Sequence, residues 1–157
     1  METFYIQLLQ YIHNHPNLKK MIIHICTYFP YITFILYPCL LIYSYLYKHD
    51  IFISVLLRPL LAFLFVTIIR KIINRPRPYE SINIKPLKQH KKGESFPSRH
   101  TLSAFVIAFA ALEVNLYIGL IALVIAIFIS LSRIFAGVHY ISDVVSAIII
   151  AVIFYII

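Results

Sequence analysis

The sequence is poor in charged residues, which make up 13% of its 157 residues, and only six of its side chains are acidic. Soluble domains carry about 25% charged residues. Here 61% of the residues are hydrophobic, and the mean hydropathy is +0.86. A small soluble domain has too much surface to bury that apolar content. These figures exclude a soluble globular domain and predict a small integral membrane protein.

Glycine and cysteine are also scarce. The chain has three glycines, eight prolines and no low-complexity tract, which excludes collagen-like and disordered chains. Cys26 and Cys39 would lie about 20 Å apart along a helix, so they do not pair, and no cysteine–histidine set has the spacing of metal ligands. The N-terminus lacks a basic region followed by a small-residue cleavage site, so we expect no cleaved signal peptide.

Positive charge is plentiful and unevenly placed. The formal net charge is +8, and nine of the fourteen lysines and arginines lie between Arg70 and Arg99. This concentration predicts an anionic partner at one face of the membrane, either lipid headgroups or a phosphorylated substrate. A nucleic acid partner is not expected, because a chain embedded in the bilayer leaves little surface for a duplex.

Hydropathy divides the chain into a short N-terminal segment and five apolar segments. Residues 1–14 are amphipathic and too short to cross about 30 Å of hydrocarbon, so they predict an interfacial helix with aromatic side chains at headgroup level. We expect an all-α integral membrane protein, a single domain over residues 1–157 with about five transmembrane helices and a polar loop at 74–97. The apolar segments cover about residues 21–47 (kinked or interrupted at Pro30 and Pro38), 51–69, 98–113, 116–131 and 141–157.

Alternate crossings of the membrane bring three polar segments, here called islands, to one face. The second apolar segment ends there at Arg70, the third begins there near Ser98, and the fourth returns there around Arg133. Ionisable groups at a membrane boundary are costly and usually functional, so this convergence predicts a site. The islands are residues 70–78, 96–101 and 132–143.

The side chains of the islands suit phosphoryl transfer. One guanidinium group can bind two phosphate oxygens at once. Of two histidines near neutral pH, one can act as the nucleophile and the other as the proton donor. On a helix, His139 and Asp143 stand on one face, so the aspartate can orient one ring nitrogen. We expect no metal and no cofactor, because no Asp, Glu and His cluster in the sequence has metal spacing. The candidate residues are Arg70, Arg77, Ser98, Arg99, His100, Ser132, Arg133, His139 and Asp143.

The islands resemble the three motifs of the phosphatidic acid phosphatase type 2 superfamily, which includes the vanadium haloperoxidases. Those motifs are K-x6-R-P, P-S-G-H and S-R-x5-H-x3-D. The first is present at residues 70–78 with arginine in place of lysine, and the second at residues 97–100 with arginine in place of glycine. The third is complete at residues 132–143. Motif order and spacing fit over nearly the whole chain.

The resemblance implies a role for each residue. His139 matches a nucleophile that forms a phosphohistidine, Asp143 orients it, and His100 protonates the leaving group. Arg99 leaves two alternatives: if the family glycine needs a positive φ, arginine costs about 1 kcal/mol, and if not, its side chain can reach a second phosphate. The phosphate ligands and support that the resemblance implies are Arg70, Arg77, Ser98, the backbone N–H of Arg99, Arg133 and Ser132.

The resemblance implies a membrane lipid phosphatase, and we expect an isoprenoid diphosphate such as undecaprenyl diphosphate as its substrate. Phosphatidate and phosphatidylglycerol phosphate are alternative substrates. Phosphotransfer from a lipid carrier to another acceptor, and a lipid-binding bundle without catalysis, are alternative functions. We expect a bacterial cell membrane location. Positive-inside counting assigns the cationic face to the cytoplasm, but phosphate-binding residues confound that count, so we follow the resemblance and expect an outward-facing site.

The remaining cations have less specific interpretations. Lys71 and Arg75 follow a membrane span, and we expect them to be snorkelling anchors. Arg58 is expected to snorkel toward the opposite face. We expect the loop lysines to form a solvated face, with attraction of anionic headgroups as the alternative. They are Lys85, Lys88, Lys91 and Lys92.

Overall fold

The computed structural model describes residues 2–89 and 91–157, and the regular secondary structure in these ranges is helical. Three stretches are long and apolar enough to cross a membrane: α2 (Pro16–Tyr47), α3 (His49–Ile73) with its extension to Ser81, and α6 (Leu116–Phe135). The all-helical fold and the membrane character predicted from sequence are confirmed. The shorter helices are α1 (Glu2–His13), α4 (Pro78–Ser81), α5 (Arg99–Val114) and α7 (Ile141–Ile156).

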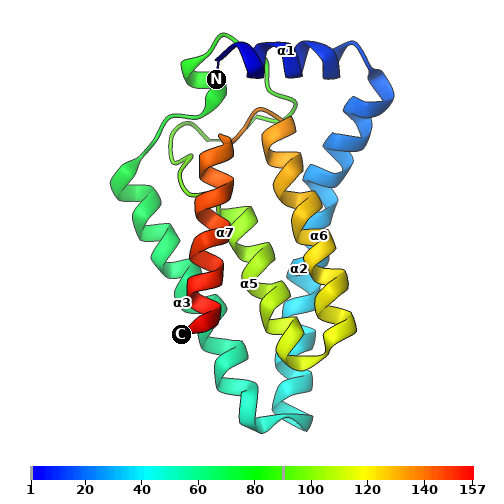
Figure 1. Ribbon diagram of the computed structural model, residues 1–157, viewed down its shortest axis with the longest axis vertical. Helices are drawn as coiled ribbons and strands as arrows, with labels where there is room; N and C mark the ends of the chain where they lie inside the picture. The colour runs from blue at the N-terminus through cyan, green and yellow to red at the C-terminus, as the bar shows by residue number, and fades with distance from the viewer. Residues whose placement is uncertain (1, 90) are drawn as a thin grey trace.

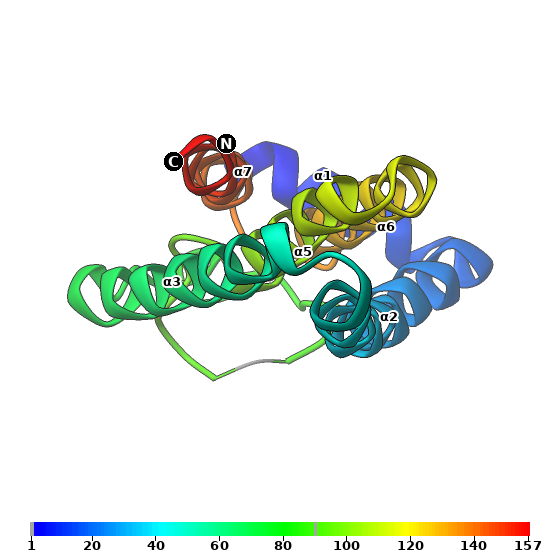
Figure 2. The ribbon, with the colours of Figure 1, turned by 90° about the horizontal axis from the view of Figure 1, so that it is seen from below.

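Helix α5 is the centre of the bundle. Ten of its 16 residues are buried, and it contacts α2, α3, α6 and α7, which surround it in Figure 2. The turn into α6 is tight, because a side-chain carbon on Gly119 would lie 2.5 Å from the Cα of Leu112, so glycine is needed there. The side chain of Asn115 caps α6 by accepting hydrogen bonds from the N–H groups of Tyr117 and Ile118.

Helix α2 runs without a break through Pro30 and Pro38, where the sequence predicted a kink or an interruption. Proline has no N–H, so Pro30 leaves the carbonyl of Cys26, four residues earlier, without its helical donor. The Nη2 group of Arg133 on α6 donates to that carbonyl at 2.9 Å. The hydrogen bond lost to proline is therefore replaced by one that ties α6 to α2.

Helix α1 lies across one end of the bundle (Figure 1), with Tyr5, Leu9 and Ile12 buried on its inner face. The Tyr5 hydroxyl donates to the carbonyl of His139 at 3.2 Å and accepts from the N–H of Ile141 at 3.1 Å. Burial raises the pKa of Tyr5 to about 12. Tyr5 is 0% exposed, so it departs from the expected headgroup position, because its hydroxyl finds both a donor and an acceptor inside the protein.

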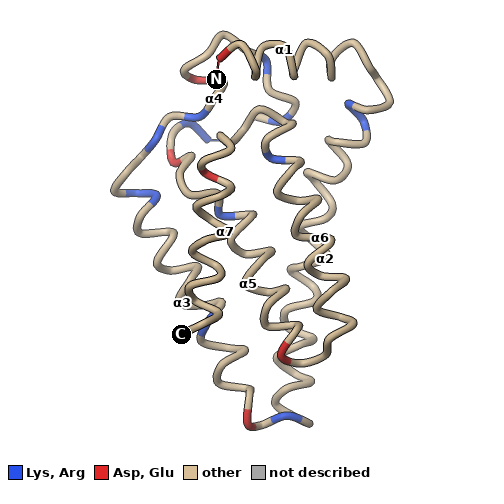
Figure 3. The backbone as a smooth tube through the Cα atoms, in the orientation of Figure 1, with Lys and Arg blue, Asp and Glu red and all other residues tan. Residues whose placement is uncertain are grey.

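The two ends of the bundle differ in charge. Figure 3 shows most lysines and arginines toward the end where α1 lies. That end also carries the loop from α3 to α5, the end of α6 and the start of α7, whereas the α2–α3 and α5–α6 turns lie at the other end (Figure 1). All three islands therefore lie at one end of the bundle.

Candidate active site

Backbone carbonyls join the first island to the other two. The Nη1 group of Arg70 donates to the carbonyl of Pro97 at 2.7 Å, which ties the first island to the second. The Nη1 group of Arg77 donates to the carbonyl of Val138 at 3.0 Å, which ties the first island to the third. Both arginines are buried, so these bonds hold the guanidinium groups at fixed positions.

His139 is buried in the loop between α6 and α7. Its Nδ1 lies 3.4 Å from Oδ2 of Asp143 and 3.4 Å from Oγ of Ser95. Its Nε2 lies 3.5 Å from Nη1 of Arg77. Burial lowers the pKa of His139 to about 4, although the Asp143 carboxylate acts in the opposite direction. The ring is therefore neutral at pH 7, and a proton on Nδ1 facing Asp143 leaves the Nε2 lone pair available for attack.

The carboxylate of Asp143 is fully buried and accepts from three donors besides facing His139. Its Oδ1 accepts from Nη1 of Arg75 at 2.8 Å. Its Oδ2 accepts from Oγ of Ser95 at 2.5 Å and from the N–H of Tyr140 at 2.9 Å. The Tyr140 bond is part of the capping box that begins α7. One carboxylate thus caps α7 and lies against the His139 ring.

Sequence reasoning missed Arg75 and Ser95. Arg75, expected to be an interfacial anchor, donates to both Asp143 and Oγ of Ser142 at 2.8 Å, and its guanidinium lies 4.1 Å from the ring centroid of Tyr140. Ser95 is fully buried beside the same carboxylate. A signal was present in the chemistry: an ionised carboxylate offers about four acceptor sites. One histidine fills only one of them, so a buried aspartate requires further donors nearby.

A cavity of about 120 Å³ is lined by His139 and by Arg77, whose Nη1 lies 3.5 Å from Nε2 of His139. Its lining carries five cationic side chains and one carboxylate, so the cavity is suited to an anion. Five of the predicted site residues line it, and the polar loop supplies four more lining residues. The lining residues are Arg70, Arg77, Lys91, Lys92, Gly93, Glu94, Arg99, His100 and His139.

The second island forms the start of α5. Ser98 is its N-cap: the Ser98 hydroxyl accepts an N–H of the first turn, and the Ser98 N–H donates to the backbone carbonyl of Asp143 at 3.0 Å. In the described chain, positive φ angles at non-glycine residues occur at Asn74 and Glu94. Arg99 is therefore not strained, because it adopts the helical conformation of the first residue of α5. Its exposed side chain lines the cavity.

Four predicted site residues lie outside the cavity lining: Ser98 and Asp143, described above, and Arg133 and Ser132. Arg133 is 1% exposed and its Nη2 is bonded to Cys26, although its charge still acts on Arg77. The hydroxyl of Ser132 donates to the carbonyl of Ile129 at 2.6 Å, within α6. In this structure Arg133 joins two helices near the site, and Ser132 is bonded within its own helix.

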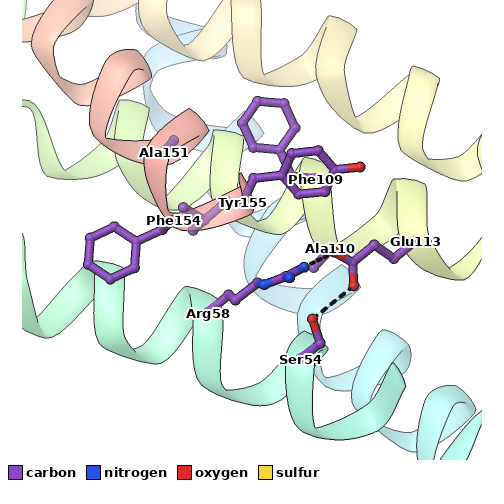
Figure 4. Close-up of a pocket in the computed structure, with 9 residues that line it drawn as sticks. Ser54, Arg58, Phe109, Ala110, Glu113, Ala151, Phe154 and Tyr155 are labelled. Atoms are coloured by element: carbon purple, nitrogen blue, oxygen red, sulfur yellow. Dashed lines mark hydrogen bonds and ion pairs between the residues drawn. The ribbon is translucent and has the colours of Figure 1, made fainter. Parts of the chain in front are cut away.

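A second charged cluster lies between α3, α5 and α7 (Figure 4), and His139 is not among the residues that line its cavity. Nη1 of Arg58 donates to the Glu113 carboxylate, and Oγ of Ser54 donates to its other oxygen at 3.1 Å. The cavity beside them is about 10 Å³, which is too small for a substrate. Arg58, expected to snorkel, instead pairs across two helices because Glu113 lies opposite it.

The profile of the PAP2 superfamily matches residues 50–157. The chain belongs to the PAP2 superfamily. Among solved structures, that of Aquifex aeolicus LpxE superposes with a TM-score of 0.75 and 30% identity, covering 96% of this chain and 92% of that one. A PAP2-type phosphatidylglycerolphosphate phosphatase from Bacillus subtilis shares the fold, with a TM-score of 0.54, 22% identity, and coverage of 98% of this chain and 90% of that one.

Two curated PAP2 relatives match shorter regions. The undecaprenyl-diphosphatase BcrC of Bacillus subtilis is 36% identical over 78 residues, which is 50% of this chain and 40% of BcrC. A lipid A 1-phosphatase of Rhizobium johnstonii is 35% identical over 103 residues, which is 61% of this chain and 40% of that protein. The chain thus spans 40% of the length of each of these relatives.

Proposed function

We propose that this protein is a membrane lipid phosphatase that works through a phosphohistidine formed on His139. The observation that carries this proposal is the environment of His139. Its ring is buried and neutral, Nδ1 lies against Asp143, and the ring lines a cationic cavity together with Arg77, which lies beside Nε2, and His100. A neutral imidazole with one nitrogen fixed and the other open to an anion is suited to attack on phosphorus.

The reaction proceeds in two steps. Nε2 of His139 attacks the phosphorus, the bond from phosphorus to the lipid oxygen breaks, and His100 gives a proton to the departing oxygen. Water then attacks the phosphohistidine while His100 takes its proton, which releases phosphate and restores His139. Cations stabilise the phosphoryl oxygens in both transition states. The phosphate ligands that we propose are Arg70, Arg77, Ser98 and the backbone N–H of Arg99, whereas Arg133 and Ser132 support the site from outside the cavity.

We infer that residues 1–157 form one domain with five spans, in which α5 and α7 cross with α2, α3 and α6. At about 1.5 Å per residue, the 16-residue helices are about 24 Å long, somewhat less than a hydrocarbon core of about 30 Å. The second and third islands include the first residues of α5 and α7, which supports a membrane boundary at that depth. Helix α1 then lies along the membrane surface above the site.

The substrate that we propose is an isoprenoid diphosphate such as undecaprenyl diphosphate. The name of the relative BcrC supports it, and so does the number of cations in the cavity. The name of the Rhizobium relative supports lipid A 1-phosphate as a second candidate. Phosphatidate and phosphatidylglycerol phosphate are further candidates from the family resemblance. We place the site at the outer face of a bacterial cell membrane, where recycling of carrier lipids takes place.

The test is phosphate release by the purified protein in detergent, with each of these four lipids supplied separately and excess chelator present. Replacement His139→Ala should abolish release. His49→Ala, at the opposite end of the bundle, is the matched control and should retain the wild-type rate. Equal rates from wild type and His139→Ala would refute the phosphohistidine. Loss of the lipid phosphate without inorganic phosphate would indicate transfer to another acceptor, and a rate restored by a divalent ion would refute the metal-free step.

The outward-facing site has a separate test. A cysteine at the exposed position Lys85, in a Cys39→Ser background, should react in intact cells with a thiol reagent that does not cross membranes. Labelling that occurs only after lysis would place the site at the cytoplasmic face.

A further inference from the structure

The cavity holds more positive charge than one phosphate requires. Arg70 and Arg77 lie near His139 and are held by backbone carbonyls. Lys91, Lys92 and Arg99 line the same cavity, but they are exposed. The charge of Arg99 acts against that of Arg70, so the two repel each other in the absence of an anion. A reaction at a single phosphate gives these three exposed cations no anionic group to bind.

The loop that carries the two lysines is fixed in place rather than solvated on all sides. Nε of Arg77 donates to the carbonyls of Lys91 at 3.0 Å and Gly93 at 3.2 Å. Glu80 accepts from the N–H of Gly93 at 2.8 Å, and Asn74 accepts from the N–H of Glu94 at 3.2 Å. The first motif and the residues around it thus hold the loop against the cavity.

The backbone of this loop is also unusual. Gly93 has φ +68° and Glu94 has φ +50°, so two successive residues are in the left-handed region. Glutamate rarely adopts that conformation, and such strain persists where surrounding contacts enforce it, often at binding sites. The Glu94 carboxylate lies 3.9 Å from the Lys91 ammonium, and both residues line the cavity.

Arg99 reaches the cavity from the start of α5 and is adjacent to His100 along the chain. Its guanidinium lies 5.7 Å from the ring centroid of Phe63 on α3, a cation–π contact that orients the side chain. Lys91 and Lys92 come from the loop and Arg99 from α5, so two separate elements supply cations to one cavity. This arrangement suits a second anionic group beside the one that faces His139.

We propose that Lys91, Lys92 and Arg99 form a second phosphate subsite, which binds the lipid-proximal phosphate of a diphosphate while His139 attacks the terminal phosphorus. The inference rests on the proposed function. The bond that breaks joins the terminal phosphorus to the bridging oxygen, which keeps the electron pair and takes a proton from His100. The leaving group is a lipid monophosphate, whose negative charge the subsite stabilises.

A lipid monophosphate offers the subsite nothing to bind, because its leaving group is an uncharged alcohol. The subsite therefore raises turnover of diphosphates selectively. A hydrogen bond between charged groups contributes enough that its loss lowers kcat/KM by about 10- to 100-fold. We expect the wild-type protein to prefer a diphosphate over the corresponding monophosphate by at least about tenfold.

The experiment compares farnesyl diphosphate with farnesyl monophosphate, which share one lipid tail, in the same detergent. Arg99→Gln should lower kcat/KM for the diphosphate by about 10- to 100-fold and for the monophosphate by less than about threefold. Lys92→Gln should change the ratio in the same direction by a smaller factor. The matched control is Lys71→Gln, an exposed cation at the end of α3 that lies outside the cavity lining and should leave both values unchanged.

Competition gives a second measurement that needs no variant. Inorganic pyrophosphate should inhibit wild-type hydrolysis of the monophosphate at least tenfold more strongly than inorganic phosphate, and this difference carries the test if Arg99→Gln fails to fold. Equal loss on both substrates, no preference in the wild type, or equal inhibition would overturn the second subsite while leaving the phosphatase intact. Release of phosphate from neither substrate by folded protein would overturn both.

Discussion

The hydroxyl of Tyr5 gives the sharpest test of how α1 contributes to the site. Tyr5→Phe removes one oxygen atom and keeps the ring that packs under α1. The carbonyl of His139 and the N–H of Ile141 then lose a partner. An unsatisfied buried polar group costs about 1–3 kcal/mol. Ile141 is partly exposed, so we expect a total of about 2–3 kcal/mol and a decrease in Tm of about 5–10 °C for a chain of this size.

The same substitution should lower kcat more than it changes KM. Tyr5 does not line the cavity, so substrate binding keeps its contacts. The His139 carbonyl, however, loses the bond that fixes the loop between α6 and α7, and small misplacements of a nucleophile reduce the rate strongly. We expect kcat to fall about tenfold, with KM within about a factor of two.

Thermal unfolding followed by circular dichroism in detergent, and phosphate release from the best lipid substrate, measure the two effects. Tyr11→Phe is the matched control, because Tyr11 lies on the same helix and is 58% exposed. It should leave Tm and kcat at wild-type values. A Tyr5→Phe protein with the same Tm and kcat as Tyr11→Phe would show that α1 does not position His139.

Three further predictions concern buried charges. The folded-state pKa of His139, about 4, lies below the usual 6.5, so the unfolded chain binds more protons between pH 4 and pH 6.5. The free energy of unfolding should therefore fall by up to about 3 kcal/mol as pH decreases from 6.5 to 4. Urea unfolding measures this dependence, which His139→Gln should lack. Arg75→Gln should lower kcat at least tenfold, because Asp143 loses its cationic partner, and Arg75→Lys should retain part of the wild-type kcat. Identical kcat values for both variants and the wild type would contradict this role. Glu113→Gln should lower Tm more than the double replacement Arg58→Met with Glu113→Leu, which leaves no unpaired charge, and melting curves in one detergent compare them.

The helices were predictable from the long apolar runs. The position of the three polar islands at one end of the bundle followed from the assumption that successive apolar segments run in opposite directions. The spacing of His139 and Asp143 likewise predicted a shared helix face, and the structure places the Asp143 carboxylate against the ring. These features depend on residues close in sequence or on the count of crossings. They need no knowledge of how loops fold.

The missed contacts join residues far apart in sequence, and they depend on how the loops close and on how the helices pack. Arg75 looked like an anchor because it follows a membrane span, yet the chain turns it back onto Asp143. Lys91 and Lys92 are exposed, as the sequence predicted, but the sequence does not show that Arg77 bonds the carbonyls of Lys91 and Gly93 and fixes the loop beside the cavity. The bond from Arg133 to Cys26 left a trace in the sequence: Pro30 frees that carbonyl, so a donor was needed from another helix.

The difference in helix length has a consequence for the lipids around the protein. Helix α2, with 32 residues, is about 48 Å long, whereas α7 is about 24 Å long and exposes Val145, Ile149 and Ile153 on its outer side. In the proposed arrangement, in which α7 crosses the membrane, hydrophobic mismatch varies around the molecule, and the bilayer next to α7 has to become thinner. His139 lies just before α7 and lines the cavity, so in this arrangement the thinnest part of the bilayer is near the cavity. On the proposed five-span fold, thinning of the bilayer there would bring a phosphate headgroup toward the cavity before any side chain contacts it.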